Sequence, residues 1–302
     1  MTVLVFGANG QLGWQCVRDL HAAVGVKREH FDASRASIEH DLVSLLDRYQ
    51  PKVIINALAY TSVDRAQEES ELAFRLNARF PDLLAKHAGD ALLIHFSSDY
   101  VFDGHSSQPY SESDLTAPLS VYGSSKLAGE LAVLESAAHA LVFRSTWLVG
   151  EHGQNFAKTI LRLACTRSEL RVVADQWGVP TPTPFLTAQL AILIKRKTGI
   201  SKGLYHLVPE GETTWHRYAC YIIEKASQHP HWQDRLRIRA ASIEPIPSQA
   251  YPLPAQRPLN SRLNCSRWRQ ALGVTHLAPF DMVLEPVLDR ILVKEPLTPG
   301  PT

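Results

Sequence analysis

The sequence contains few residues of the kinds that define special protein classes. Its 302 residues include four cysteines, Cys16, Cys165, Cys220 and Cys265, and no two of them form a CxxC pair. Such widely spaced single cysteines make neither a disulfide framework nor a zinc site. We therefore expect these four thiols to be reduced, as in a cytoplasmic protein, and to bind no metal.

Excess charge and long apolar runs are also lacking. The formal net charge is +1, which gives no electrostatic reason to expect a nucleic acid or an anionic membrane as partner. No run approaches the roughly 18 apolar residues of a membrane span. The N-terminal stretch MTVLVFGANG is too short for a secretion signal and has no basic region before it.

What is present is an ordinary globular composition with alternating strand and helix patterns. Short apolar runs predict buried strands at 3–6, 52–56, 91–96 and 140–146. Helices are expected at 12–20, after the first strand, and at 65–88, between the strands at 52–56 and 91–96. This alternation is typical of βαβ units. It predicts an α/β fold with a Rossmann-like, doubly wound parallel sheet.

The pattern changes after residue 150, where prolines cluster at 178–185 and 245–258. We predict an NAD(P)-binding Rossmann domain over 1–150, to which later segments can return. Residues 151–295 are then mainly a smaller α/β lobe that binds the substrate, and the Pro-rich residues 296–302 are a frayed tail.

A glycine-rich loop follows the first predicted strand. VFGANGQLG places Gly7, Gly10 and Gly13 between that strand and the next helix, with Gln11 and Leu12 at the start of the helix. Glycines let backbone N–H groups approach a pyrophosphate, and the N-terminus of the helix favours its negative charge. The loop predicts a dinucleotide site, against the alternative of an ordinary strand–helix turn.

The second predicted strand starts at Val24 and bears on the choice of dinucleotide. NAD-binding proteins usually place an acid after this strand, but here Lys27 and Arg28 occupy its end. Basic side chains suit a 2′-phosphate, which favours NADPH over NADH. Asp32 and Ala33 follow and are expected near the adenine. The alternative is a solvated, charged turn.

Two further segments complete the candidate cofactor site. NALAYT, after the third strand, contributes Ala57, Ala59, Tyr60 and Thr61, whose mostly small side chains let the backbone pass close to a cofactor. SVYGSSKLAGE places Tyr122 and Lys126 four residues apart, on one face of a predicted helix. Taken alone, the second segment also fits a chance Tyr–Lys pair on a solvated helix.

The motifs GxxGxxG, SSDYVFDG (97–104) and YGSSK (122–126) together resemble those of the extended short-chain dehydrogenases/reductases. The segments 143–156, 172–183, 203–215 and 255–263 narrow the resemblance to the dTDP-4-dehydrorhamnose reductase family. It covers nearly the whole chain. It implies reduction, with NADPH or NADH, of the C4 ketone of dTDP-4-dehydro-L-rhamnose (dTDP-6-deoxy-L-lyxo-4-hexulose) to give dTDP-L-rhamnose.

The resemblance also implies roles for three side chains. Tyr122 would donate a proton to the ketone oxygen, and Lys126 would lower the pKa of that phenol and hold the nicotinamide ribose. Ser98 would polarise the ketone by a hydrogen bond. The family commonly has threonine at this position, so the hydroxyl survives here without the methyl group.

Further residues would face the sugar nucleotide. Asp99 and Tyr100 would line the sugar, while Trp147 and Asn155 would contact the nucleotide sugar. Arg257 would bind the diphosphate through bidentate hydrogen bonds. Structural packing is the alternative for Asp99, Tyr100 and Trp147.

One departure from the family concerns magnesium. Some members have an acid after the glycine loop, in GWE, that helps to bind Mg²⁺ at a dimer interface, whereas this chain has GWQ with Gln15. A neutral amide is a poor magnesium ligand beside a carboxylate. We therefore expect no Mg²⁺ there, and the homodimer built on that site is open to question.

Three other functions fit the same motifs. The protein could be a 4-ketoreductase or an epimerase–reductase for another nucleotide sugar, an epimerase or dehydratase, or a non-catalytic NADP-binding regulatory subunit. The intact set of Ser98, Tyr122 and Lys126 argues against the regulatory subunit, because a protein that only binds has no need of all three.

Overall fold

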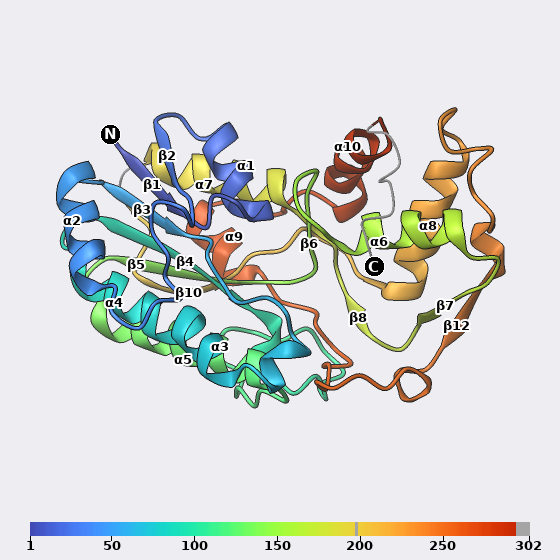
Figure 1. Ribbon diagram of the computed structural model, residues 1–302, viewed down its shortest axis with the longest axis horizontal. Coiled ribbons are helices and arrows are strands. Elements are labelled where there is room, and N and C mark those ends of the chain that lie inside the picture. Colours follow the sequence, from blue (N-terminus) through green and yellow to red (C-terminus); the bar gives the residue numbers. More distant parts are fainter. Residues whose placement is uncertain (197–198, 294–302) are drawn as a thin grey trace.

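Six parallel strands form the central sheet of the computed structural model, which describes residues 1–196 and 199–293. Their order across the sheet is β10-β5-β4-β3-β1-β2 (Figure 1). The strands are β1 (Val3–Phe6), β2 (Ala23–Val26), β3 (Val53–Asn56), β4 (Leu92–Ser98), β5 (Ala140–Ser145) and β10 (Gly203–His206). The predicted strands are confirmed, and β2 ends at Val26, where the chain turns polar.

Helices cover both faces of the sheet, as a doubly wound fold requires (Figure 1). Alternate residues of β1 point to opposite faces, so Val3 and Val5 join one hydrophobic core while Leu4 and Phe6 join another. The first core includes α1 (Gln11–Asp19), α7 (Thr183–Arg196) and α9 (Ser266–Leu272); the second includes α2 (Glu39–Tyr49), α4 (Phe80–His87) and α5 (Val121–Ser136). The predicted fold class is confirmed.

The helix predicted over 65–88 is interrupted. It comprises η1 (Arg65–Gln67), α3 (Ser70–Phe74), the π-helical turn η2 (Arg75–Arg79) and α4. Such π-turns insert one extra residue into a helix and are frequent at functional sites. Here the turn directs the buried side chain of Asn77 towards Ser125 of α5, to which its amide donates a hydrogen bond of 2.9 Å.

A third hydrophobic core lies outside the sheet. It is formed by α6 (Phe156–Thr166), α8 (Trp215–Ser227), α10 (Phe280–Val293) and the parallel pair β7 (Leu170–Val173) and β12 (Ile243–Ile246). The remaining elements are β6 (Leu148–Val149), β8 (Trp177–Gly178), β9 (Thr181–Pro182), β11 (Thr213–Thr214), η3 (Asp99–Val101), η4 (Ala240–Ser242) and η5 (Ser248–Ala250).

The chain passes between the third core and the sheet more than once, because α7, β10 and α9 return to the sheet. The division at residue 150 stays a prediction, and the predicted tail 296–302 lies outside the described residues. Within the described ranges, every helix is too short or too polar to cross a lipid bilayer.

Gly129 of α5 is where the π-turn meets the next helix. A Cβ atom added there would lie only 1.8 Å from the backbone oxygen of Asn77. Helix propensity alone predicts that Gly129→Ala stabilises the protein by about 1 kcal/mol. Because a helix or the turn must shift to admit the methyl group, we expect the opposite: the free energy of unfolding falls by about 1–3 kcal/mol.

Urea unfolding measures this change. Ala128→Gly, in the same helix, is the control and should cost about 1 kcal/mol through propensity alone. A Gly129→Ala variant more stable than the unmodified protein would show that the two backbones are not in contact.

Candidate active site

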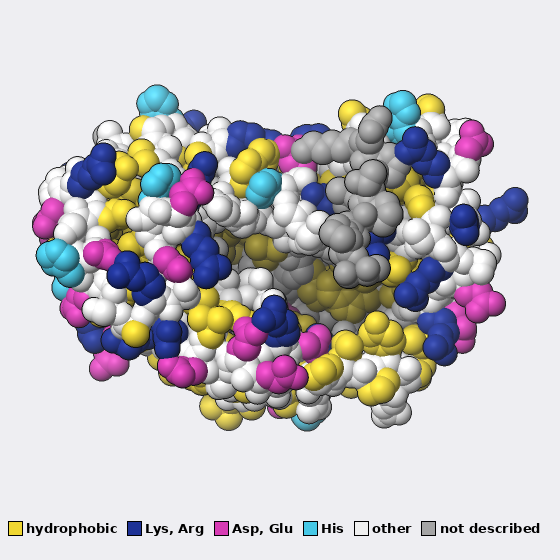
Figure 2. All heavy atoms as spheres, in the orientation of Figure 1, with side chains coloured by type: hydrophobic (Ala, Val, Ile, Leu, Met, Phe, Trp, Pro, Cys, Tyr) yellow, Lys and Arg dark blue, Asp and Glu magenta, His cyan; other side chains and the backbone are white. Residues whose placement is uncertain are grey.

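The predicted site residues lie at the carboxyl ends of the sheet strands, between the sheet and the smaller lobe. The molecule is hollowed there, and hydrophobic side chains gather at the floor of the hollow (Figure 2). In open α/β sheets, ligands bind outside the carboxyl ends of the strands, where the strand order reverses. That reversal falls between β1 and β3 in this sheet.

The glycine loop joins β1 to α1. Gly7 has φ +80°, and a Cβ atom on it would lie 2.6 Å from the Leu58 nitrogen, while one on Gly13 would lie 2.1 Å from the Gly7 oxygen. The fold itself therefore requires these two glycines. Gly10 is different, because its nearest neighbour to an added Cβ is 3.4 Å away. Its open side lets a phosphate approach the amides of α1.

The two residues after Gly10 offer mainly their backbone to a ligand. The Leu12 side chain is buried in the core on the α1 face of the sheet. The Gln11 Oε1 atom accepts hydrogen bonds from Gly150 N at 3.0 Å and from Asn155 Nδ2 at 3.1 Å. Asn155 also caps α6, since its Oδ1 accepts from Lys158 N. The side chain of Gln11 thus ties the glycine loop to the smaller lobe.

Basic groups follow β2 directly, as predicted. The side chains of Lys27 and Arg28 are 54% and 76% exposed. The Asp32 carboxylate accepts hydrogen bonds from Ser34, which hold its pKa below the usual value, and lies 3.5 Å from Arg28. Ala33 is buried. Lys27 likewise lies 3.8 Å from Glu29, so each exposed cation has a carboxylate partner that an added phosphate could replace.

The segment after β3 is fixed along the glycine loop. The Ala57 amide donates to the Phe6 oxygen at 3.1 Å. Tyr60 exchanges two backbone hydrogen bonds with the Asn77 side chain, and its phenol donates to Glu69 at 2.6 Å. Ala59 is partly exposed and Thr61 is exposed, so the backbone of this segment stays accessible.

The structure brings Ser98, Tyr122 and Lys126 together. Ser98 ends β4, while Tyr122 and Lys126 lie on consecutive turns of α5. Ser120 caps this helix by accepting from Gly123 N, and a Cβ atom on Gly123 would lie 2.2 Å from the Tyr100 oxygen. The start of α5 therefore packs tightly against η3, which brings the Tyr122 phenol within hydrogen-bond reach of Ser98.

Burial sets the protonation of this group. Lys126 is 2% exposed, and burial lowers its pKa to about 8, although Glu130 opposes the shift. Burial raises the pKa of Tyr122 to about 12, and the Ser98 hydrogen bond opposes it. The expected lowering of the tyrosine pKa is therefore wrong for the protein's own side chains. The ammonium donates instead to the Phe96 carbonyl at 2.5 Å.

Asp99 and Tyr100 flank the same point. The Ser98 hydroxyl donates to the Asp99 carboxylate at 2.9 Å, and burial raises the pKa of that carboxyl to about 6. The Tyr100 ring packs edge-on against the Tyr122 ring, with centroids 5.4 Å apart. These two predicted sugar-lining residues are thus in contact with the catalytic candidates.

Trp147 has a strained backbone, with φ +41°. Its ring stacks on Trp215, with centroids 3.6 Å apart, and a Cβ atom on Gly178 would lie 2.6 Å from it. Residues forced into the left-handed region cluster at binding sites. This geometry places Trp147 behind Trp215, which itself lines the large cavity of the smaller lobe.

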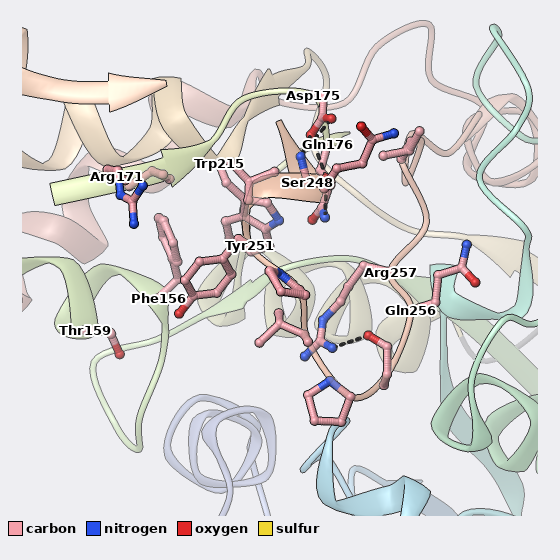
Figure 3. Close-up of a pocket in the computed structure, with 18 of the residues that line it drawn as sticks. Phe156, Thr159, Arg171, Asp175, Gln176, Trp215, Ser248, Tyr251, Gln256 and Arg257 are labelled. Carbon is pink, nitrogen blue, oxygen red and sulfur yellow. Dashed lines mark hydrogen bonds between the residues drawn. The ribbon is translucent and has the colours of Figure 1, made fainter. Parts of the chain in front are cut away.

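That cavity has a volume of about 1000 Å³ and reaches from Tyr100 to α6 and β7 (Figure 3). Its wall includes the segment 248–259, whose start is held by three hydrogen bonds from Ser248 to Asp175. Several lining residues carry no motif and lie on ordinary amphipathic or Pro-rich segments, so no sequence pattern predicted them: Phe156, Thr159, Arg171, Trp215 and Tyr251.

Arg257 lines the same cavity, and its role in binding a diphosphate stays a prediction, because its guanidinium already has a partner. It forms a bidentate ion pair with Asp64, with N–O distances of 2.5 and 2.6 Å (Figure 3 shows its further bond to a backbone oxygen). Asp64 belongs to the sheet side of the molecule, and sequence reasoning gave no signal for it.

Gln15 belongs to α1, faces α7 and is 1% exposed. Its Nε2 donates to Asp19 at 2.5 Å, and its Oε1 accepts from Thr183. No cluster of three His, Cys, Asp or Glu side chains suited to a metal occurs among residues 1–196 and 199–293. The absence of Mg²⁺ at this position stays a prediction.

Comparison with known proteins covers nearly the whole chain. The family model described as RmlD substrate binding domain matches residues 1–293. The dTDP-4-dehydrorhamnose reductase of Shigella flexneri is 41% identical over 89% of this chain and 91% of its own. A probable dTDP-4,6-dihydroxy-2-methyloxan-3-one 4-ketoreductase of Streptomyces antibioticus is 34% identical over 98% and 97%.

Solved structures agree. The dTDP-4-dehydrorhamnose reductase of Bacillus anthracis, in complex with NADP, is 30% identical with a TM-score of 0.86 over 96% of this chain and 99% of its own. The Clostridium acetobutylicum enzyme is also 30% identical, with a TM-score of 0.85 over the same shares. With the motifs, the fold and these relatives in agreement, the chain belongs to the dTDP-4-dehydrorhamnose reductase family, a family of oxidoreductases.

Proposed function

We propose that this protein uses NADPH to reduce the C4 ketone of dTDP-4-dehydro-L-rhamnose, giving dTDP-L-rhamnose. The observation that carries the proposal is the convergence of Ser98, Tyr122 and Lys126 at the end of β4. Tyr100, whose ring packs against that of Tyr122, lines a cavity large enough for a nucleotide sugar. Curated relatives named for this activity share 36–41% identity with the chain.

The residues present fit NADPH. The open side of Gly10 and the amides of α1 suit the pyrophosphate, and Lys27 and Arg28 suit the 2′-phosphate. Asp32 and Ala33 would lie near the adenine, and the backbone of Ala57–Thr61 along the cofactor. Lys126 would hold the nicotinamide ribose. When bound, NADPH supplies the hydride for the ketone carbon.

The protein's own part in the reaction is to move a proton onto the ketone oxygen. With its pKa raised to about 12, the Tyr122 phenol is protonated at neutral pH and can donate to that oxygen. Ser98 would turn its hydroxyl from Asp99 to the ketone oxygen and polarise it. The Lys126 ammonium would stabilise the phenolate left after the transfer.

The cavity suits the rest of the substrate. The sugar would lie against Asp99, Tyr100 and Tyr122, and the diphosphate against Arg257. The aromatic rings of Phe156, Trp215 and Tyr251 line the cavity beyond Arg257 and suit a stacked base. Trp147 supports this wall by stacking on Trp215, and Asn155 shapes the loop above Gln11.

A second candidate is a 4-ketoreductase for another dTDP-deoxysugar. The Streptomyces antibioticus relative, named for such a substrate, is 34% identical over 98% of the chain. The same proton donor would serve, because the ketone position is unchanged and only the sugar contacts differ. We also propose a cytoplasmic location, where nucleotide sugars are made and thiols stay reduced, and a homodimer that does not depend on Mg²⁺ at Gln15.

Loss of NADPH absorbance in the presence of enzymatically made dTDP-4-dehydro-L-rhamnose tests the proposal. We expect turnover, and NMR of the product should identify dTDP-L-rhamnose. Turnover confined to a different dTDP-ketosugar would replace the first candidate by the second. Cofactor binding without turnover of any nucleotide ketosugar would favour a regulatory protein.

Lys27 and Arg28 determine the choice of cofactor in this account. The double variant Lys27→Ala, Arg28→Ala removes two cations from the expected 2′-phosphate position, so kcat/KM for NADPH should fall at least about tenfold, the worth of one charge-assisted hydrogen bond. The value for NADH, which lacks that phosphate, should change little. Equal losses with both cofactors, or a wild-type preference for NADH, would contradict the assignment.

Burial of Lys126 makes stability depend on pH. Its pKa is lowered from 10.5 to about 8 in the folded protein, so between these values the unfolded chain binds more protons than the folded one. Stability from this group therefore rises with pH across that window. Lys126→Met removes this titration. The unfolding free energy of the unmodified protein, minus that of the variant, should therefore increase between pH 7 and pH 10.

Urea unfolding at both pH values measures the difference, and Lys86→Met provides the control. Lys86 is exposed and paired with Asp82, which raises its pKa, so its removal should produce no such gain. A difference for Lys126→Met that stays constant with pH would show that the ammonium is not buried as described.

A further inference from the structure

The ion pair between Asp64 and Arg257 joins the sheet side of the molecule to the wall of the cavity. Asp64 lies between β3 and η1, on the sheet side, whereas Arg257 belongs to the cavity segment 248–259. Both carboxylate oxygens are used, with Nη1 at 2.5 Å from one and Nη2 at 2.6 Å from the other. Asp64 also accepts a hydrogen bond from the Ala255 amide at 3.1 Å.

The guanidinium has few donors left in this arrangement. One Nη1 hydrogen goes to Asp64 and the other to the Ala255 carbonyl, and one Nη2 hydrogen goes to Asp64. The fork formed by Nη1 and Nη2 is therefore occupied by a carboxylate, which has the geometry to accept from both, while the edge formed by Nε and the second Nη2 hydrogen is not used by Asp64. A diphosphate must displace Asp64 to use that fork.

The balance of charge favours such an exchange. The Asp64 side chain is 36% exposed, so water can solvate its carboxylate when it leaves the arginine. The Arg257 side chain is 16% exposed and lines the cavity wall. A diphosphate carries more negative charge than a carboxylate and accepts more hydrogen bonds from the same cation.

We propose that Asp64 is a built-in competitor for the substrate diphosphate: it holds Arg257 before the nucleotide sugar binds and gives it up on binding. The proposal rests on the proposed function, in that it takes the cavity as the nucleotide-sugar site. Because substrate and product carry the same diphosphate, Asp64 weakens the binding of both to a similar degree. Asp64 is thus a positioning residue that favours release of the product.

The pair has a second consequence for the cavity wall. Segment 248–259 is held at its start by Asp175 and near its end by Asp64, through the Ala255 amide and Arg257. Displacement of Asp64 transfers the second anchor from the protein to the ligand. The wall of the cavity is then fixed by the diphosphate itself.

Calorimetric titration of the full-length protein with dTDP tests this without turnover. Asp64→Asn removes the competing charge but keeps the shape of the side chain, and dTDP should bind about 3- to 10-fold more tightly. Glu68→Gln is the matched control: Glu68 is exposed in the same segment, and its removal should change the affinity less than twofold. Weaker binding by Asp64→Asn would overturn the inference, since it would mean that Asp64 only supports Arg257.

A double-variant cycle separates this effect from general electrostatics. Arg257→Ala should weaken dTDP binding about 10- to 100-fold, as expected for lost charge-assisted hydrogen bonds, and Asp64→Asn should add nothing in that background. An unchanged affinity in Arg257→Ala, or an equal gain from Asp64→Asn with and without the arginine, would overturn the inference.

The outcome is independent of the test of the proposed function. If Asp64→Asn binds dTDP more tightly than the unmodified protein, but the unmodified protein reduces none of the ketosugars, the inference holds and the proposed reaction fails. If it reduces the ketosugar but the cycle shows no coupling between the two residues, the reaction stands and the role of Asp64 is wrong.

Discussion

The Lys126 ammonium is buried beneath α5 and donates a hydrogen bond to the Phe96 carbonyl of β4. A buried charge without partners would be very costly, so this bond holds one turn of the helix at one position along the strand. Tyr122 lies one turn earlier and is thereby held beside Ser98, two residues beyond Phe96. The geometry of the proposed reaction depends on this contact.

Close packing of α5 against its neighbours holds the Lys126–Phe96 contact in place. Gly123 lets the start of α5 approach the Tyr100 carbonyl, and Gly129 lets its middle approach the π-turn at Asn77. Below them, Glu130 pairs with the buried Arg144 of β5, at 2.9 Å from its Nε. The helix that carries the proton donor is thus fixed along its length by close packing and buried polar bonds, so the phenol can be aimed without relying on a loop.

Sequence patterns predicted the parts of the molecule that obey local rules. Buried parallel strands appear in the sequence as short apolar runs. The glycine loop is recognisable because a side chain at Gly7 or Gly13 would clash with the backbone, so both positions must be glycine. The Tyr122–Lys126 spacing was meaningful because a helix places both on one face. The direction expected for the tyrosine pKa was wrong for the protein alone, since burial of the phenol, which no spacing reveals, raises that pKa.

Other features depend on contacts between distant segments. The π-turn at 75–79 packs closely against α5, and helix periodicity does not distinguish it from a regular turn. Asp64 and Arg257 are 193 residues apart, so their pairing could not be anticipated without the fold. The cavity is likewise assembled from α6, β7 and the segment 248–259, each of which has an ordinary sequence.

Turnover of Tyr122→Phe tests the central claim most directly, because the variant keeps the ring and removes only the transferable hydrogen. With saturating NADPH and dTDP-4-dehydro-L-rhamnose, kcat should fall by roughly 100- to 10,000-fold, the usual worth of general acid catalysis. The affinity for NADPH should hardly change, since Lys126 is intact. Tyr100→Phe removes the neighbouring phenol oxygen and should cost far less in kcat. A stable Tyr122→Phe protein with nearly full turnover would show that Tyr122 is not the proton donor.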